Sequence, residues 1–149
     1  MFERILSLFQ SDTPEPLPEL DARLALGALL VRMAKADHAY LFEEIAQIDR
    51  ILAEHSGLNP VEAAKMRAQC ERLEEQLPAS ADATTVIRNA TSEAERAATV
   101  EALWRVCLAD GISHESEQDL LALVETELGV SPEDGVRLRD AAKARLDLG

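Results

Sequence analysis

Acidic side chains recur at matched places in two stretches of the chain, about seventy residues apart. Asp37 is followed by Glu44, and Asp110 is followed at the same spacing by Glu117. The second stretch also carries His114, and from Asp110 to Asp134 it holds eight acids and no Lys or Arg. Carboxylates that converge without basic partners suit a hard cation such as Ca²⁺, Mg²⁺ or Mn²⁺, and His114 would admit a softer metal. The pattern therefore makes a divalent cation the candidate ligand, although no cofactor is certain.

The same acids have a purely structural interpretation. An Asp near a helix start caps it, and a Glu in the first turn interacts favourably with the helix dipole. The spacing is not that of an EF-hand loop, whose oxygen ligands alternate through the loop. A third interpretation is a recognition surface for a protein partner. His38 and His55 are expected to be a surface turn residue and a helix-end residue.

The residues around the acids show that one helical unit occurs twice. In both copies an apolar run precedes the Asp, and an amphipathic run follows it and ends at a Gly close to a helix-starting Pro. The matching residues are Ala36, Asp37, His38, Gly57 and Pro60 in the first copy and Ala109, Asp110, Gly111, Gly129 and Pro132 in the second. Such self-similarity predicts two similar units, over about 20–77 and 92–147.

Composition and periodicity predict an all-α fold. The chain is 47% hydrophobic but only 3% aromatic, so its core must be aliphatic, which suits helices better than sheets. No useful period-2 alternation occurs, and we expect a bundle of about seven to eight helices. The expected body helices are Leu20–Ala36, Leu41–His55, Pro60–Leu77, a short one through Val86–Ala90, one opened by Ser92 and Glu95 and ending at Leu108, His114–Leu128 and Pro132–Leu146.

Smaller features complete this picture. Pro78–Asp82 is expected to be a loop. On the second body helix Leu41, Ile45, Ile48 and Leu52 should face inward, and Glu43, Gln47, Arg50 and Glu54 outward. Asn59, Ser92 and Ser131 are expected N-caps. Cys70 and Cys107 are expected to be buried free thiols, because neither belongs to a CxxC pair.

The N-terminus is expected to be a separate element. Residues 1–10 form an amphipathic pattern with Phe2, Ile5, Leu6 and Phe9 on one face. Residues 11–19 carry Pro14, Pro16 and Pro18 and should be an extended linker. The tethered helix could pack back on the bundle, dock on a neighbouring molecule, as in a homodimer, or touch a membrane surface.

Net charge restricts the partners. At −13, the chain repels phosphate backbones and anionic lipid, which disfavours nucleic acid and leaves membrane association only indirect, through a partner. Metal cations and basic surfaces of other proteins are the partners it attracts. No apolar run has membrane-spanning length and no secretory signal is present, so the cytoplasm is the expected location.

The repeated segments carry a resemblance to a known family. They read Leu29–Asp37 and Glu43–Asp49 in the first half, and Val100–Gly111 with Glu117 in the second. Here the chain resembles the TerB family, the tellurite-resistance TerB-like domain, over roughly Leu20 to Ala142, with 20–149 as the whole helical domain. The resemblance implies a bacterial cytoplasmic bundle of two similar helical units, associated with tellurite resistance and metal or stress response. It also implies that Asp37, Glu44, Asp110 and Glu117 are candidate metal ligands, although His38 stands where Gly is usual.

Three functions follow as hypotheses. The first is a non-catalytic module whose acidic face binds a divalent cation, a basic protein partner, or both. The second is a structural or scaffolding homodimer without metal. The third is a metal-dependent hydrolase, but the sequence holds no HExxH, nucleophile elbow or glycine-rich phosphate loop.

Overall fold

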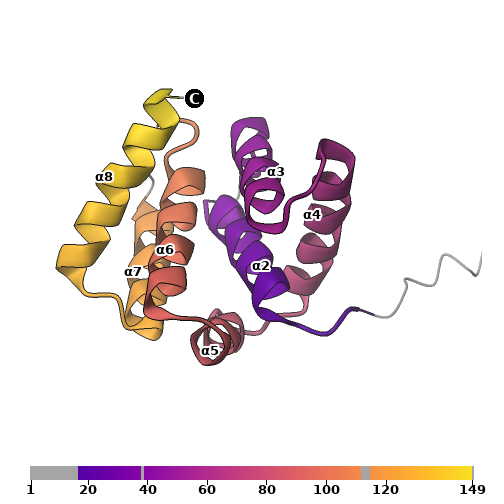
Figure 1. Cartoon of the computed structure of the whole chain (residues 1–149), viewed down its shortest axis with the longest axis horizontal. Coiled ribbons are helices and arrows are strands. Elements are labelled where there is room, and N and C mark those ends of the chain that lie inside the picture. The colour runs from indigo at the N-terminus through magenta and orange to yellow at the C-terminus, as the bar shows by residue number, and fades with distance from the viewer. Residues whose placement is uncertain (1–16, 38, 112–114, 149) are drawn as a thin grey trace, which may run out of the picture.

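A computed structural model describes residues 17–37, 39–111 and 115–148, and over these ranges the protein is all-helical with no strand. The expected N-terminal helix, most of the linker, His38 and His114 lie outside the described residues. The described chain forms seven helices (Figure 1). They are α2 (Ala22–Lys35), α3 (Phe42–Ser56), α4 (Pro60–Glu75), α5 (Ala81–Ala90), α6 (Glu93–Cys107), α7 (Glu115–Leu128) and α8 (Pro132–Leu148).

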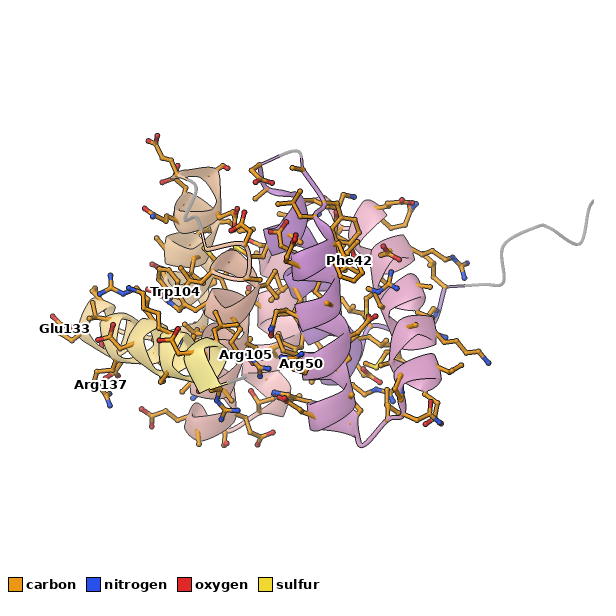
Figure 2. The ribbon with its side chains drawn as sticks, turned by 90° about the horizontal axis from the view of Figure 1, so that it is seen from above. Phe42, Arg50, Trp104, Arg105, Glu133 and Arg137 are labelled. Carbon is orange, nitrogen blue, oxygen red and sulfur yellow. The ribbon has the colours of Figure 1, made fainter. Side chains whose placement is uncertain are left out.

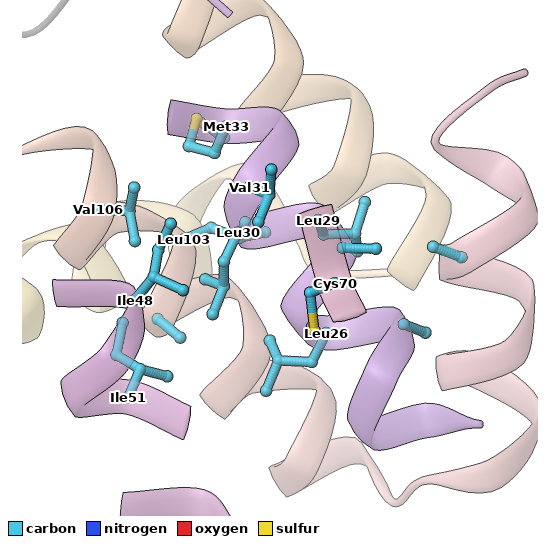
Figure 3. Packing of buried hydrophobic residues seen from close by; sticks show 14 of the residues in the cluster. Leu26, Leu29, Leu30, Val31, Met33, Ile48, Ile51, Cys70, Leu103 and Val106 are labelled. Atoms are coloured by element: carbon cyan, nitrogen blue, oxygen red, sulfur yellow. The ribbon is translucent and has the colours of Figure 1, made fainter. Parts of the chain in front are cut away.

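Helix α2 is the centre of the molecule. Ten of its 14 residues are buried, as expected for a helix that is apolar nearly all round. It packs against α3, α4, α5, α6 and α7. Figure 3 shows Leu29, Leu30 and Val31 of α2 among buried side chains of the neighbouring helices. Because one helix meets so many others, the core is continuous through the described bundle.

The remaining helices lie on two sides of this centre. Helix α4 packs on α2, and α8 packs on α6, while α5 lies between the two groups at the lower end of Figure 1. Helices α2, α3 and α4 come from the first predicted unit, and α6, α7 and α8 come from the second. The structural similarity of the two units stays a prediction.

The expected helix starts are confirmed by their caps. Asn59 accepts a hydrogen bond from the backbone N–H of Glu62, and Ser92 accepts one from that of Glu95. Ser131 accepts one from Asp134, directly before α8. Each cap satisfies a backbone donor that the first helical turn leaves open. Both cysteines are buried free thiols, also as expected.

Two local expectations were wrong. Pro78–Asp82 is not all loop, because α5 begins at Ala81. The Asp82 carboxylate accepts a hydrogen bond from the N–H of Ala79, which stabilises this helix start. Gln47 does not face solvent: it is buried, because the guanidinium of Arg105 on α6 reaches its side-chain oxygen across the bundle. Among the described residues, no helix is long and apolar enough to cross a membrane.

Candidate functional site

The two acidic turns lie at the same end of the molecule. Helices α2 and α6 pack against each other, and both run from the lower to the upper part of Figure 1. The turn that carries Asp37 follows α2, and the turn that carries Asp110 follows α6. Parallel packing of the two preceding helices therefore brings the repeated motifs to one end of the bundle.

The first turn is held by its own carboxylates. Asp37 Oδ1 accepts a hydrogen bond from the N–H of Ala39 at 3.1 Å. Glu44 Oε1 accepts one from the N–H of Leu41, also at 3.1 Å. These are the local bonds expected of a turn and a helix cap. Glu44 therefore caps the start of α3, as the structural interpretation expects, whereas Asp37 bonds within the turn that precedes it.

Glu44 has a property that capping alone does not require. It is the third residue of α3, and only 1% of it is exposed. Capping glutamates usually keep their carboxylates in water, because burying the charged form is costly. This carboxyl group instead lies among the helices that meet at the upper end of the bundle.

The second turn repeats this placement. Gly111 has a φ of 78°, the left-handed conformation expected at this position, which glycine adopts without steric cost. Asp110 is half-buried. Glu117 is the third residue of α7, as Glu44 is of α3, and it is 0% exposed. The repeat therefore buries one glutamate at the same helical position in each half.

The described residues do not by themselves complete a metal centre. Among them, no three His, Cys, Asp or Glu side chains are grouped closely enough to hold an ion. The expected set includes His114, which lies outside the described residues. The assignment of Asp37, Glu44, Asp110, Glu117 and His114 as ligands therefore stays a prediction.

An ion pair between buried Arg105 and exposed Glu54 joins α6 to α3. Arg105 of α6 donates to both carboxylate oxygens of Glu54 on α3, at 2.8 and 3.3 Å, and to Gln47 Oε1 at 3.4 Å. Figure 2 shows Arg105 where α6 faces α3. Sequence reasoning missed this contact because its partners are more than fifty residues apart.

The corresponding arginine of the first half acts differently. Arg32 precedes Asp37 by the same interval at which Arg105 precedes Asp110. Its guanidinium donates to the carbonyl oxygens of Glu74 and Leu77 at the end of α4, at 3.2 and 2.5 Å. Arg32 thus caps a helix C-terminus within its own half, whereas Arg105 ties one half to the other.

Cys70 does not contribute a reactive group. Burial raises the pKa of the Cys70 thiol to about 12, so it stays protonated at neutral pH. The thiolate is the form that binds metals and attacks electrophiles. Cys70 is therefore a core residue, in line with the sequence prediction.

Fold and site together define an acidic, all-helical module whose matched turns share one end. The chain belongs to the TerB family: residues 23–140 match the family model described as tellurite resistance protein TerB. This match spans α2 to most of α8 and confirms the resemblance drawn from the repeated segments. No curated protein and no solved structure matches the chain.

Proposed function

We propose that this protein is a non-catalytic TerB-family module of a tellurite-resistance or metal-stress system. It binds a divalent cation at the paired turns through Asp37, Glu44, Asp110 and Glu117, with His114 as an additional ligand. The observation that carries the proposal is the burial of Glu44 and Glu117 at the same position of α3 and α7. The sequence holds no motif of a hydrolase, which favours a binding role over catalysis.

Electrostatics support a cation at this end. A carboxylate removed from water gains from an adjacent positive charge, and a divalent ion is the strongest local charge that a site of oxygen ligands accepts. The chain as a whole carries a net charge of −13, so its field concentrates cations around the molecule. Two acids from each turn would supply the oxygen ligands that Ca²⁺, Mg²⁺ or Mn²⁺ prefers.

The same end has features of a protein contact. Phe42, the first residue of α3, is 78% exposed, and its neighbour Glu43 is exposed as well. Aromatic side chains are common anchors at protein interfaces. An exposed ring among acids suits a partner with a basic rim around an apolar pocket. We therefore include a basic protein partner in the proposed function.

Thermal unfolding with added metal tests the cation site. We expect millimolar Ca²⁺, Mg²⁺, Mn²⁺ or Zn²⁺ to raise the melting temperature by several degrees, because a ligand at a hundred times its Kd stabilises the fold by about 2.7 kcal/mol. Glu44→Gln and Asp110→Asn should reduce this rise while retaining side-chain oxygens for local hydrogen bonds. Isothermal calorimetry on the same proteins gives the affinity.

Glu133→Gln is the matched control. Glu133 is an exposed glutamate in the first turn of α8, outside both turns, and its replacement makes the net charge less negative by the same single unit (Figure 2). The control should bind metal as the wild type does. If Glu133→Gln and Glu44→Gln reduced the metal-induced rise in melting temperature equally, the rise would come from the overall negative charge and not from a site. A melting temperature that no metal changes would refute the site.

A further inference from the structure

A cavity of about 410 Å³ lies at the end of α2 opposite to the acidic turns. The start of α2, the end of α3, the end of α5 and the start of α6 line it. Leu26 and Ile87, both buried, and Ala98 form its apolar part. Arg23 and His55 are exposed and line it where it reaches solvent. Its volume is in the range of small-molecule sites, which begins at roughly 300 Å³.

Arg23 brings a positive charge to the edge of this cavity. Most arginines of the protein bind an acid or a carbonyl group, as Arg32, Arg67 and Arg105 do. In the part of the chain that the structure describes, Arg23 has no ion pair and no hydrogen-bonded acceptor. This matters in a protein with 28 acids and 15 Lys and Arg, where acidic partners are abundant.

The one acid that lines the cavity has its own partners. Glu95 Oε1 accepts hydrogen bonds from the backbone N–H and the hydroxyl of Ser92, in the capping box of α6. Its charge therefore lies against the positive end of a helix dipole. Arg23 and His55 are left to receive an anion from outside the chain.

Two threonine hydroxyl groups of the cavity further restrict the ligand. Thr99 donates to the carbonyl oxygen of Glu95, and Thr91 donates to that of Ile87. Each hydroxyl hydrogen is therefore used within its own helix, and the oxygen can only accept. The cavity thus offers the Arg23 guanidinium, the His55 imidazole and the Ser56 hydroxyl to a ligand, and no donor from these threonines.

We propose that this cavity binds a small monocarboxylate with a compact aliphatic body. The guanidinium of Arg23 and the imidazole of His55 bind the carboxylate, and Leu26, Ile87 and Ala98 contact the aliphatic body. A monoanion is favoured over a phosphate ester, because the field of a chain with a net charge of −13 repels a dianion more strongly. The site is independent of the acidic turns, from which the length of α2 separates it.

Titration of the ¹⁵N-labelled full chain with pentanoate tests the proposal. We expect saturating amide shifts at Arg23, His55, Ile87 and Ala98. Pentanamide, with the same body and no charge, should bind about tenfold more weakly, which is the usual value of a charge-assisted hydrogen bond. Inorganic phosphate should bind more weakly than pentanoate.

Two variants and a control locate the site. Arg23→Gln should weaken pentanoate binding about tenfold, and Ala98→Leu should abolish it by filling the cavity. Arg50→Gln removes an exposed arginine of α3 that does not line the cavity, and it should bind as the wild type does. Arg23 is exposed, so we expect Arg23→Gln to fold normally. This variant therefore tests the site even if Ala98→Leu does not fold.

Several results would overturn the proposal. Equal binding of pentanoate and pentanamide would remove the role of the charge. Equal weakening by Arg23→Gln and Arg50→Gln would show diffuse attraction instead of a site. Shifts that do not saturate, or phosphate that binds more tightly than pentanoate, would exclude a monocarboxylate site.

Discussion

At the scale of single residues, the partly buried carboxyl group of Glu125 costs the fold free energy. Glu125 of α7 lies between α6 and α8: Trp104 Nε1 donates to its Oε1 at 3.3 Å, and a Cβ at Gly135 would lie 2.7 Å from its Oε2. Burial raises the pKa of this carboxyl group, and the hydrogen bond from Trp104 offsets only part of the rise. A side chain at position 135 would therefore require the Glu125 carboxyl group to shift.

This raised pKa predicts a stabilising substitution. The folded state favours the protonated form of Glu125. The contribution of this protonated carboxyl group to the stability of the fold is therefore complete below the unfolded pKa of about 4.5, and it is lost as pH rises through the folded pKa. We expect Glu125→Gln to stabilise the protein at pH 7 by about 0.5 kcal/mol, a value reduced for solvent screening, and to keep the acceptor for Trp104. Urea unfolding at pH 7 and pH 4 should show the gain at pH 7 only. Glu75→Gln, at an exposed glutamate, should show none.

At the scale of elements, α2 and α4 approach closely because Gly27 has no side chain. A Cβ on Gly27 would lie 2.2 Å from Cys70 Sγ and 3.2 Å from its Cβ. We expect Gly27→Ala to destabilise the protein by about 2 kcal/mol, because overpacking outweighs the gain in helix propensity. Cys70→Ala removes the sulfur atom, so the double variant should be more stable than the sum of the single changes predicts. Urea midpoints for the four proteins measure this coupling, and strict additivity would contradict it.

The elements also show what could be predicted from the sequence. The starts of α4, α6 and α8 were predicted correctly, because Asn59, Ser92 and Ser131 act within one helical turn of themselves. The start of α5 was missed, since its first residues carry neither an apolar periodicity nor a side-chain cap.

The candidate site was predictable only in part. The repeat placed four acids in two turns, but the burial of Glu44 and Glu117 depends on helices distant in sequence. The burial of Gln47 was missed for the same reason, because it depends on Arg105 from the other half. Local sequence patterns thus determined the helices and turns, whereas contacts between the halves could not be inferred from them.

At the scale of the whole molecule, the ion pair between Arg105 and Glu54 connects the two halves. Only 7% of the Arg105 side chain is exposed, compared with 44% of that of Glu54. The hydrogen bond from Arg105 lowers the pKa of Glu54, so this contribution is present above the unfolded pKa and is lost as pH falls through the folded pKa. Because of this difference in exposure, removing Arg105 and removing Glu54 should change the free energy of unfolding by different amounts.

Removing either partner should therefore have different effects. Glu54→Ala leaves a buried guanidinium whose remaining hydrogen-bond acceptor among the described residues is Gln47, and we expect a loss of about 2 kcal/mol. Arg105→Met fills the same space without charge and leaves Glu54 to water, so we expect a loss of about 1 kcal/mol or less. Arg32→Met is the control within one half. Hydrogen exchange should show faster opening of contacts between α3 and α6 in Glu54→Ala and not in Arg32→Met. Equal destabilisation by Glu54→Ala and Arg105→Met would contradict this account of how the halves are joined.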